Sequence, residues 1–207
     1  MCGRYVITKP ETKTKKYVKS SINVEDKDNY NAHPYQGLPV IKAYTNGCTL
    51  ENLKWGMIPG WAKKKEFKAL INARLETINE KISFKKLIKI KRCIAIMDGF
   101  YEWRRDGTNK TPFYFQNTDK NMMFVAGIYD NDEFCLITEE ANDNVKEIHH
   151  RQPVILSSKD INNYLNLEIE GYQFLNARKK PNLEFYEISR DVNKPTNNNL
   201  SLLQRIN

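Results

Sequence analysis

The sequence predicts an α+β fold: a single domain with a mixed, mostly antiparallel β-sheet, a barrel-like core and flanking helices. Two hairpin signals favour this class, because Asn46-Gly47 and Asp106-Gly107 each separate short runs that resemble strands. Helical patterns lie between these hairpin-linked strands. The length of 207 residues suits one domain with a substantial core. We therefore expect one domain over 1–207, with its core over about 2–195 and a partly irregular C-terminal tail.

The first half of the chain is predicted to contain short strands and short helices. The expected elements are a strand over 2–8, a helix toward 19, hairpin strands over 40–45 and 48–55, and a basic helix over 83–91. The first helix begins at Thr8-Lys9-Pro10-Glu11, which has the pattern of a capping box. Residues 23–38 form a polar loop with prolines, and 67–76 is ambiguous.

Strands dominate the second half. The expected elements are strands over 93–103 and 111–116, a hairpin of 122–129 and 133–138, helices over 145–150, 158–165 and 172–178, and a strand over 183–188. Ser158 is predicted to cap the second of these helices.

Composition narrows the possible partners and compartments. The chain has 33 Lys and Arg against 25 Asp and Glu, a net charge of +8. This excess indicates a polyanionic partner, although a solvated lysine-rich surface explains it equally well. The four cysteines form no CxxC pair, so we expect no metal, no other cofactor and no disulfide framework. No signal peptide and no apolar run of about 18 residues occur, which favours a cytoplasmic protein without a membrane span.

The most informative position is Cys2. If Met1 is removed, Cys2 carries a free α-amine next to its thiol, and this pair can trap an aldehyde. The amine forms an imine, and the thiol then closes a five-membered thiazolidine ring in a fast intramolecular step. The alternative is an inert, buried cysteine in a first strand with Met1 retained.

Two side chains are candidates for proton transfer. His149, at the end of a predicted helix, is either a proton shuttle or a surface histidine favoured by the helix dipole. It should point about 100° away from His150. Glu102 shares a strand face with Phe100, so it is either a desolvated carboxylate with a raised pKa or an exposed strand glutamate.

Two segments are candidates for binding a polyanion. Asn72, Arg74 and Glu76 share one face if their segment is extended, so the amide can orient a reacting group and the guanidinium can bind phosphate. The alternative is an ion pair between Arg74 and Glu76. Trp61 lies beside Lys63–Lys65, which combines a stacking surface with positive charge as in single-stranded nucleic-acid binders. Trp55 is as easily a core residue.

Six separated motifs, taken together, resemble the SOS-response-associated peptidase (SRAP) family in the family's order. They are Met1-Cys2-Gly3-Arg4-Tyr5, Tyr30-Asn31 with Pro34, Trp55-Gly56-Met57-Ile58-Pro59-Gly60-Trp61-Ala62, Asn72-Ala73-Arg74-Leu75-Glu76-Thr77, Gly99-Phe100-Tyr101-Glu102-Trp103 and His149-His150-Arg151-Gln152-Pro153. The resemblance spans about 2 to 195. Gln152 replaces a usual Met, His33 a small residue and Ile96 a frequent proline, and none of these changes removes a catalytic group.

The resemblance implies an SRAP fold and covalent capture of abasic sites in single-stranded DNA. The residues it implies for the chemistry are Cys2, Asn72, Glu102 and His149. Those it implies for DNA contact are Arg4, Pro34, Trp61, Arg74 and Thr138.

In the expected reaction, His149 promotes opening of the sugar ring to its C1′ aldehyde. Asn72 orients the Cys2 amine, and Glu102 relays protons while the imine forms. We expect a monomer associated with DNA and acting in the DNA damage response. One alternative is a cysteine-type peptidase that uses Cys2 as an N-terminal nucleophile and removes its own leader. The other is a non-covalent single-stranded DNA-binding module in which Cys2 is structural.

Overall fold

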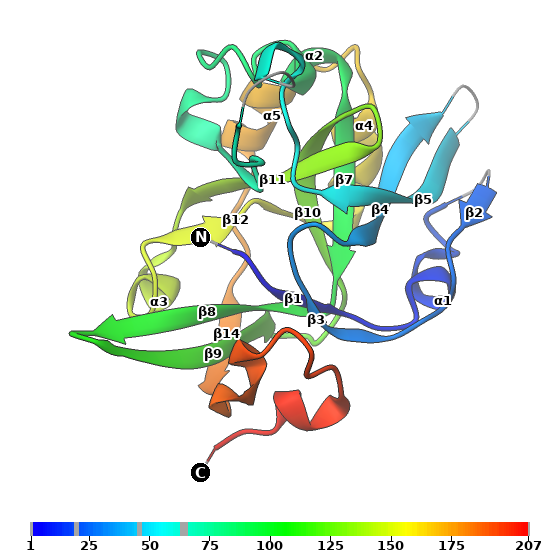
Figure 1. Cartoon of the computed structure of the whole chain (residues 1–207). Helices are drawn as coiled ribbons and strands as arrows, with labels where there is room; N and C mark the ends of the chain where they lie inside the picture. The colour runs from blue at the N-terminus through cyan, green and yellow to red at the C-terminus, as the bar shows by residue number, and fades with distance from the viewer. Residues whose placement is uncertain (1, 19–20, 45–46, 63–65, 207) are drawn as a thin grey trace.

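The computed structural model describes residues 2–18, 21–44, 47–62 and 66–206, which form two β-sheets with short helices around them (Figure 1). The smaller sheet has five strands in the order β14 (Leu183–Glu187), β9 (Asn109–Asn117), β8 (Gly99–Asp106), β1 (Tyr5–Ile7) and β3 (Asn29–Ala32). All of its neighbouring strands are antiparallel.

The larger sheet contains nine strands. Its main path is β12 (Arg151–Pro153), β11 (Glu133–Glu140), β10 (Met123–Asp130), β7 (Arg92–Met97), β4 (Gly37–Tyr44), β5 (Gly47–Trp55) and β2 (Ser21–Asn23). In addition, β13 (Ile155–Leu156) pairs with β10, and β6 (Asn72–Arg74) pairs in parallel with β11. A short parallel pairing of β11 with β5 curls the sheet back on itself, but the sheet is not a clean barrel. The α+β class and the mostly antiparallel pairing are confirmed.

The α-helices are short and lie outside the sheets, as expected. They are α1 (Pro10–Thr14), α2 (Leu87–Ile90), α3 (Asp143–Lys146), α4 (Ile161–Leu165) and α5 (Gly171–Ala177). In Figure 1, α2, α4 and α5 gather at one end of the larger sheet, whereas α1 lies at its side. The core fills the space between the two sheets, and Trp55 is completely buried in it, which confirms the core interpretation of that residue.

The strand expected over 93–103 is wrong as one element, because the chain changes sheets at Asp98. β7 belongs to the larger sheet and β8 to the smaller one. The Asp98 carboxylate accepts hydrogen bonds from the Thr8 backbone N–H and hydroxyl at 2.8 and 2.7 Å. Gly99 permits the bend, because a Cβ there would lie 2.5 Å from the Tyr114 hydroxyl.

The first helix also begins differently from the expected capping box. Lys9 stands at the N-cap in a left-handed conformation with φ of 47°, and no side chain caps the helix. Thr8 is unavailable as a cap because its hydroxyl binds Asp98. The helix ends at Thr14, well before residue 19.

Other helices are shifted or shortened. The helix expected over 83–91 is reduced to α2, and the one expected over 145–150 to α3. Ser157, rather than Ser158, forms a capping box with Asp160 ahead of α4. The hairpin strands around Gly47 are confirmed, while Asn46 of the predicted turn lies outside the described residues.

The C-terminal segment is more ordered than the irregular tail that the sequence predicts. It contains two short 3-10 helices, Arg190–Asn193 and Leu200–Leu203. Buried Val192 and Leu202 pack with Tyr101 on the outer side of the smaller sheet. This segment therefore covers a face of the sheet that would otherwise be exposed to water.

Candidate active site

Four segments that lie far apart in the sequence meet at the N-terminal end of the chain. They carry the four residues expected to perform chemistry: Cys2 before β1, Asn72 on β6, Glu102 on β8 and His149 after α3. The Asn72 side-chain amide donates to the Cys2 carbonyl at 3.0 Å, and His149 Nδ1 lies 4.0 Å from Glu102 Oε1. The charge of Glu102 also acts on the Cys2 thiol. The site therefore lies where the two sheets face each other.

Cys2 is fully buried, with its Sγ 3.9 Å from the Arg4 carbonyl oxygen, to which it donates. Burial raises the pKa of the Cys2 thiol far above its usual range, and the nearby Glu102 carboxyl raises it further. The thiol is consequently protonated at neutral pH. It becomes a nucleophile only when a neighbouring group removes its proton.

Glu102 is buried with 3% of its surface exposed, which confirms the desolvated interpretation of the strand pattern. Burial raises the pKa of Glu102, because a buried carboxylate loses its hydration. The strand alternates as expected, because Phe100 belongs to the main core whereas Tyr101 packs toward the C-terminal segment. β8 thus holds a carboxyl group against the reacting end of the chain.

His149 is held neutral by its surroundings. The pKa of His149 is lowered to about 4, and burial is the largest cause. Its Nδ1 accepts the Arg151 backbone N–H at 3.0 Å, which places the proton of the neutral ring on Nε2. α3 ends before the histidines, so His149 and His150 do not occupy separate helix faces. Instead their rings stack with centroids 4.5 Å apart.

β6 places Asn72 and Arg74 on one side of the strand, with buried Ala73 on the other. This part of the expected polar stripe is confirmed. A 3-10 turn follows at Leu75–Thr77 and takes Glu76 out of the stripe. Glu76 pairs with Arg151 at 2.8 and 2.9 Å, in place of the suggested ion pair with Arg74. Arg74 remains exposed beside the site.

Arg4 and Thr138 are engaged by the protein itself. One nitrogen of the Arg4 guanidinium donates to Asn31 Oδ1 at 2.7 Å and to the Val192 carbonyl at 2.9 Å. The side chain of Thr138 is completely buried, and its hydroxyl accepts from Arg151 at 3.3 Å. Thr138 therefore presents no side-chain surface to a ligand, whereas half-buried Arg4 is held firmly in place.

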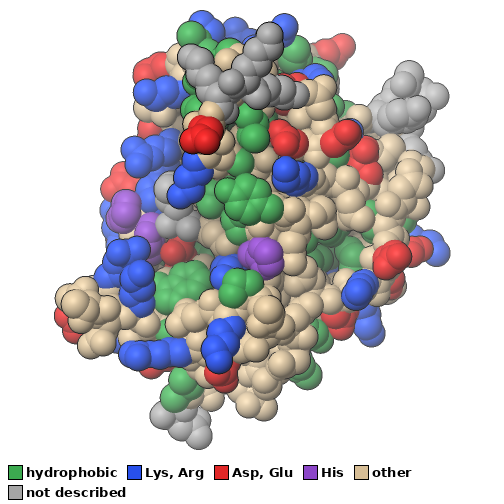
Figure 2. All heavy atoms as spheres, viewed as in Figure 1, with side chains coloured by type: hydrophobic (Ala, Val, Ile, Leu, Met, Phe, Trp, Pro, Cys, Tyr) green, Lys and Arg blue, Asp and Glu red, His purple; other side chains and the backbone are tan. Residues whose placement is uncertain are grey.

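Aromatic surface is available on the segments that carry Pro34 and Trp61. Trp61 is 55% exposed and rests with its ring edge-on to Phe67, at a centroid distance of 5.4 Å. Pro34 is half-buried, and its neighbour Tyr35 is 57% exposed. The sequence reasoning missed Tyr35, although an aromatic residue directly after Pro34 was a visible signal. On the face of the molecule that Figure 2 shows, hydrophobic side chains lie among lysine, arginine and histidine side chains.

Neither a metal cluster nor a spanning helix is found among the described residues. No group of three or more His, Cys, Asp or Glu in those ranges could hold a metal ion. Within the same part of the chain, no helix is long and apolar enough to cross a membrane.

Comparison with known proteins identifies the family of this chain. The chain is 35% identical over 190 residues to the abasic site processing protein YoqW of Bacillus subtilis, covering 84% of this chain and 85% of that one. It is 30% identical over 190 residues to the abasic site processing protein YedK of Escherichia coli, covering 86% and 84%. A solved structure of a protein from Bacteroides thetaiotaomicron superposes with a TM-score of 0.85 at 26% identity, covering 99% of this chain and all of that one. The model of the SOS response associated peptidase (SRAP) family matches residues 1–195, and the chain belongs to this family.

Proposed function

We propose that this protein binds single-stranded DNA and captures abasic sites covalently through Cys2 once Met1 has been removed. The observation that carries the proposal is the convergence of an N-terminal cysteine with a buried carboxyl and a neutral imidazole. Such a set is suited to condensation of an amine with an aldehyde. The names of the relatives, abasic site processing proteins, support the same substrate.

The first steps make an imine. The neutral His149 ring carries its proton on Nε2 and promotes opening of the abasic sugar through that N–H, which donates a hydrogen bond to the ring oxygen. As the bond between C1′ and the ring oxygen breaks, the C1′ hydroxyl loses its proton to water and the ring oxygen takes one from water, which leaves a C1′ aldehyde. The Cys2 amine attacks C1′ while Asn72 holds the Cys2 backbone through its carbonyl. Glu102, whose pKa burial raises, acts in its protonated form and donates a proton to the departing hydroxyl, which leaves as water.

Ring closure then needs a base for the buried thiol. Glu102 is a carboxylate after it has donated its proton, and it takes the proton of the Cys2 thiol. The resulting thiolate attacks C1′ and closes the thiazolidine. In total, the aldehyde and the aminothiol combine with loss of one water. One buried carboxyl thus serves first as an acid and then as a base.

Binding of the DNA strand is assigned to side chains around this centre. Arg4 and exposed Arg74 would contact phosphates, and Trp61 with Pro34 would stack on flanking bases. Thr138 has a supporting role here, since it holds Arg151. We also propose that the chain acts as a single monomeric domain associated with DNA in the damage response.

The decisive experiment mixes protein that lacks Met1 with single-stranded DNA carrying one abasic site, followed by intact mass and a denaturing gel. We expect a heat-stable adduct with the mass of protein plus DNA minus one water. Cys2→Ala retains the amine but cannot close the ring, so it should give no heat-stable adduct. A strong adduct from Cys2→Ala would contradict the thiazolidine.

Two further samples separate the alternatives. Protein with Met1 retained should bind DNA without cross-linking, because its α-amine stands one residue away from the thiol. No adduct from protein confirmed to lack Met1 would favour plain DNA binding. Removal of Met1 by the purified protein itself would reveal a peptidase activity, which is compatible with DNA capture.

A further inference from the structure

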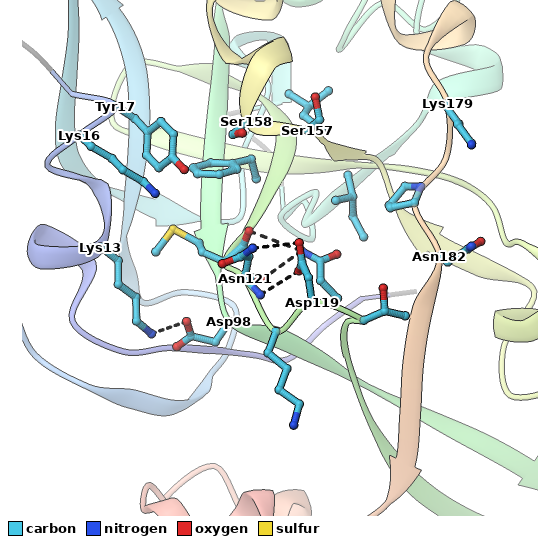
Figure 3. A pocket seen from close by; sticks show the side chains of 18 of the residues that line it. Lys13, Lys16, Tyr17, Asp98, Asp119, Asn121, Ser157, Ser158, Lys179 and Asn182 are labelled. Atoms are coloured by element: carbon cyan, nitrogen blue, oxygen red, sulfur yellow. Dashed lines mark hydrogen bonds and ion pairs between the residues drawn. The ribbon is translucent and has the colours of Figure 1, made fainter.

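An open groove of about 1320 Å³ lies outside the candidate active site. Its walls are α1, the turn between β9 and β10, the segment that begins at Ser157 ahead of α4, and residues 179–182. Figure 3 shows Lys13, Lys16 and Tyr17 on one side and Lys179 and Asn182 on the other. We name this groove the lysine trough and propose that it is a second contact surface for single-stranded nucleic acid.

The lysine trough is strongly positive. Its lysines are Lys13, Lys15, Lys16, Lys120, Lys179 and Lys180, against the acidic residues Asp98 and Asp119. Both aspartates are engaged within the protein, Asp98 by Thr8 and Lys13, and Asp119 by the backbone and side chain of Asn121. Lys15, Lys16, Lys120 and Lys179 form no ion pair with any described residue. Their charges are therefore available to a bound polyanion.

The floor of the trough identifies the kind of polyanion. Phe124, Ile155 and Leu156 line it but are at most 3% exposed, since they are packed in the core. An acidic peptide would gain affinity by burying apolar anchors in pockets, and these side chains leave no such pocket. Besides the partly buried Tyr17 and Met122, the trough offers ammonium groups and the side-chain amide of Asn182, since the Asn121 amide donates to Asp119. Such groups suit a phosphate backbone.

The trough lies on the other side of the molecule from Cys2. Asp98 lines it and binds Thr8, six residues after Cys2 along a segment whose strand, β1, covers Tyr5–Ile7. At about 3.3 Å per residue for a fully extended segment, this separation is at most roughly 20 Å. In Figure 1, α1 lies to the right of the segment before β14, whereas in Figure 3 it lies to the left. Figure 3 therefore views the molecule from the back of Figure 1. The inference rests on the proposed function, because it extends the path of the same strand.

The test compares two triple variants with equal loss of charge. Lys15→Gln/Lys120→Gln/Lys179→Gln removes one lysine from each of three walls of the trough. The control, Lys85→Gln/Lys86→Gln/Lys89→Gln, removes three exposed lysines around α2. Fluorescence anisotropy measures Kd for two undamaged single strands. The short strand has about 8 nucleotides, which is enough to fill one binding surface, and the long strand is about five times longer. The salt dependence of Kd and the melting temperature are recorded in parallel.

For the long strand, we expect the trough variant to bind at least about tenfold more weakly, with a salt slope smaller by about 0.7 for each lost phosphate contact. The short strand and the control variant should change little. Equal weakening in both variants, or none in the trough variant, would overturn the inference. Binding of poly-glutamate that the trough variant loses, with unchanged DNA binding, would also overturn it, in favour of an acidic protein.

Failure of the proposed function would appear elsewhere. Cross-linking of a short abasic strand by protein that lacks Met1 and carries no substitution depends on Cys2 and needs no contact with the trough. Its absence would count against the proposed function, whereas the long-strand affinities test the trough alone.

Discussion

Replacing Arg151 with alanine should destabilise the fold beside the active site. The Arg151 side chain is 9% exposed and makes two hydrogen bonds to the Glu76 carboxylate, at 2.8 and 2.9 Å. It also donates to the Thr138 carbonyl at 2.7 Å. These bonds tie the turn after β6 to β12, and so hold the strand of Asn72 next to the segment that carries His149.

The loss of folding free energy expected for Arg151→Ala follows from how exposed each hydrogen-bond partner of Arg151 is. Glu76 is 47% exposed, so water replaces most of what its carboxylate loses, and this part is worth about 0.5–1 kcal/mol. The buried Thr138 carbonyl loses a charged donor, which costs about 1–3 kcal/mol. The total is about 1.5–4 kcal/mol. At about 2–4 °C per kcal/mol for a chain of this size, Tm should fall by roughly 3–16 °C.

The pH dependence tests the origin of this loss. Burial raises the pKa of Glu76, but the hydrogen bonds and charge of Arg151, together with hydrogen bonds from backbone N–H groups, outweigh it and hold the pKa below its usual range. The stability from this pair is therefore present above the unfolded pKa of about 4.3 and is lost as pH falls through the folded pKa. Urea unfolding at neutral and acidic pH should show the difference between Arg151→Ala and the unmodified protein narrowing in acid.

A matched control and two outcomes complete the test. Arg190→Ala removes an exposed arginine and should change the free energy of unfolding by no more than about 0.5 kcal/mol. A loss in Arg151→Ala no larger than that of the control would refute the reasoning. So would a loss that stays constant from neutral pH to acid.

Three further predictions concern other parts of the site and fold. The His149 ring, with its pKa lowered to about 4, should titrate near that value by NMR, and a midpoint near 6.5 would show that burial does not control it. As pH falls, the unfolded state takes up a proton at this histidine near pH 6.5, whereas the folded state takes it up only near pH 4. The free energy of unfolding should therefore decline as pH falls from about 6.5 to 4, and His149→Gln should remove that decline. Asn72→Asp cannot donate to the Cys2 carbonyl, so cross-linking should slow by roughly 2- to 10-fold, whereas an unchanged rate would leave the amide without a positioning role. Gly99→Ala drives a Cβ into the Phe115 carbonyl oxygen and the Tyr114 side chain, so it should lower the free energy of unfolding by about 1–3 kcal/mol or more, as measured by thermal melting. The control Gly60→Ala should be nearly neutral, because a Cβ there meets no atom within 4 Å. Equal Tm values for the two variants would contradict the steric argument.

Local pattern predicted much of the fold because its signals act over a few residues. The hairpin around Asp106-Gly107 follows from turn chemistry and is confirmed. Strand periodicity left Glu102 either buried or exposed, and the structure shows that it is buried. The bend at Asp98 was missed because it depends on Thr8, ninety residues away. The capping box failed for the same reason, since Thr8 bonds to that distant carboxylate.

For the candidate site too, the sequence predicted the positions of some residues and not of others. Motif order identified Cys2, Asn72, Glu102 and His149, and the structure brings all four together. Motif order placed Thr138 on a DNA-contacting surface, yet its side chain is buried. Burial depends on how β11 pairs with its neighbours, which residue type alone does not reveal.

By itself, the sequence determined the fold class, the positions of most strands and the residues that could carry chemistry. These properties depend on side-chain identity and on the short period of strands and turns. Only the tertiary structure decided the protonation of the site, since desolvation keeps the Cys2 thiol and the His149 ring uncharged. It alone also gathered lysines from α1, from the turn after β9 and from residues 179–182 into one trough. Desolvation and charge clustering both depend on distances between segments that folding brings together.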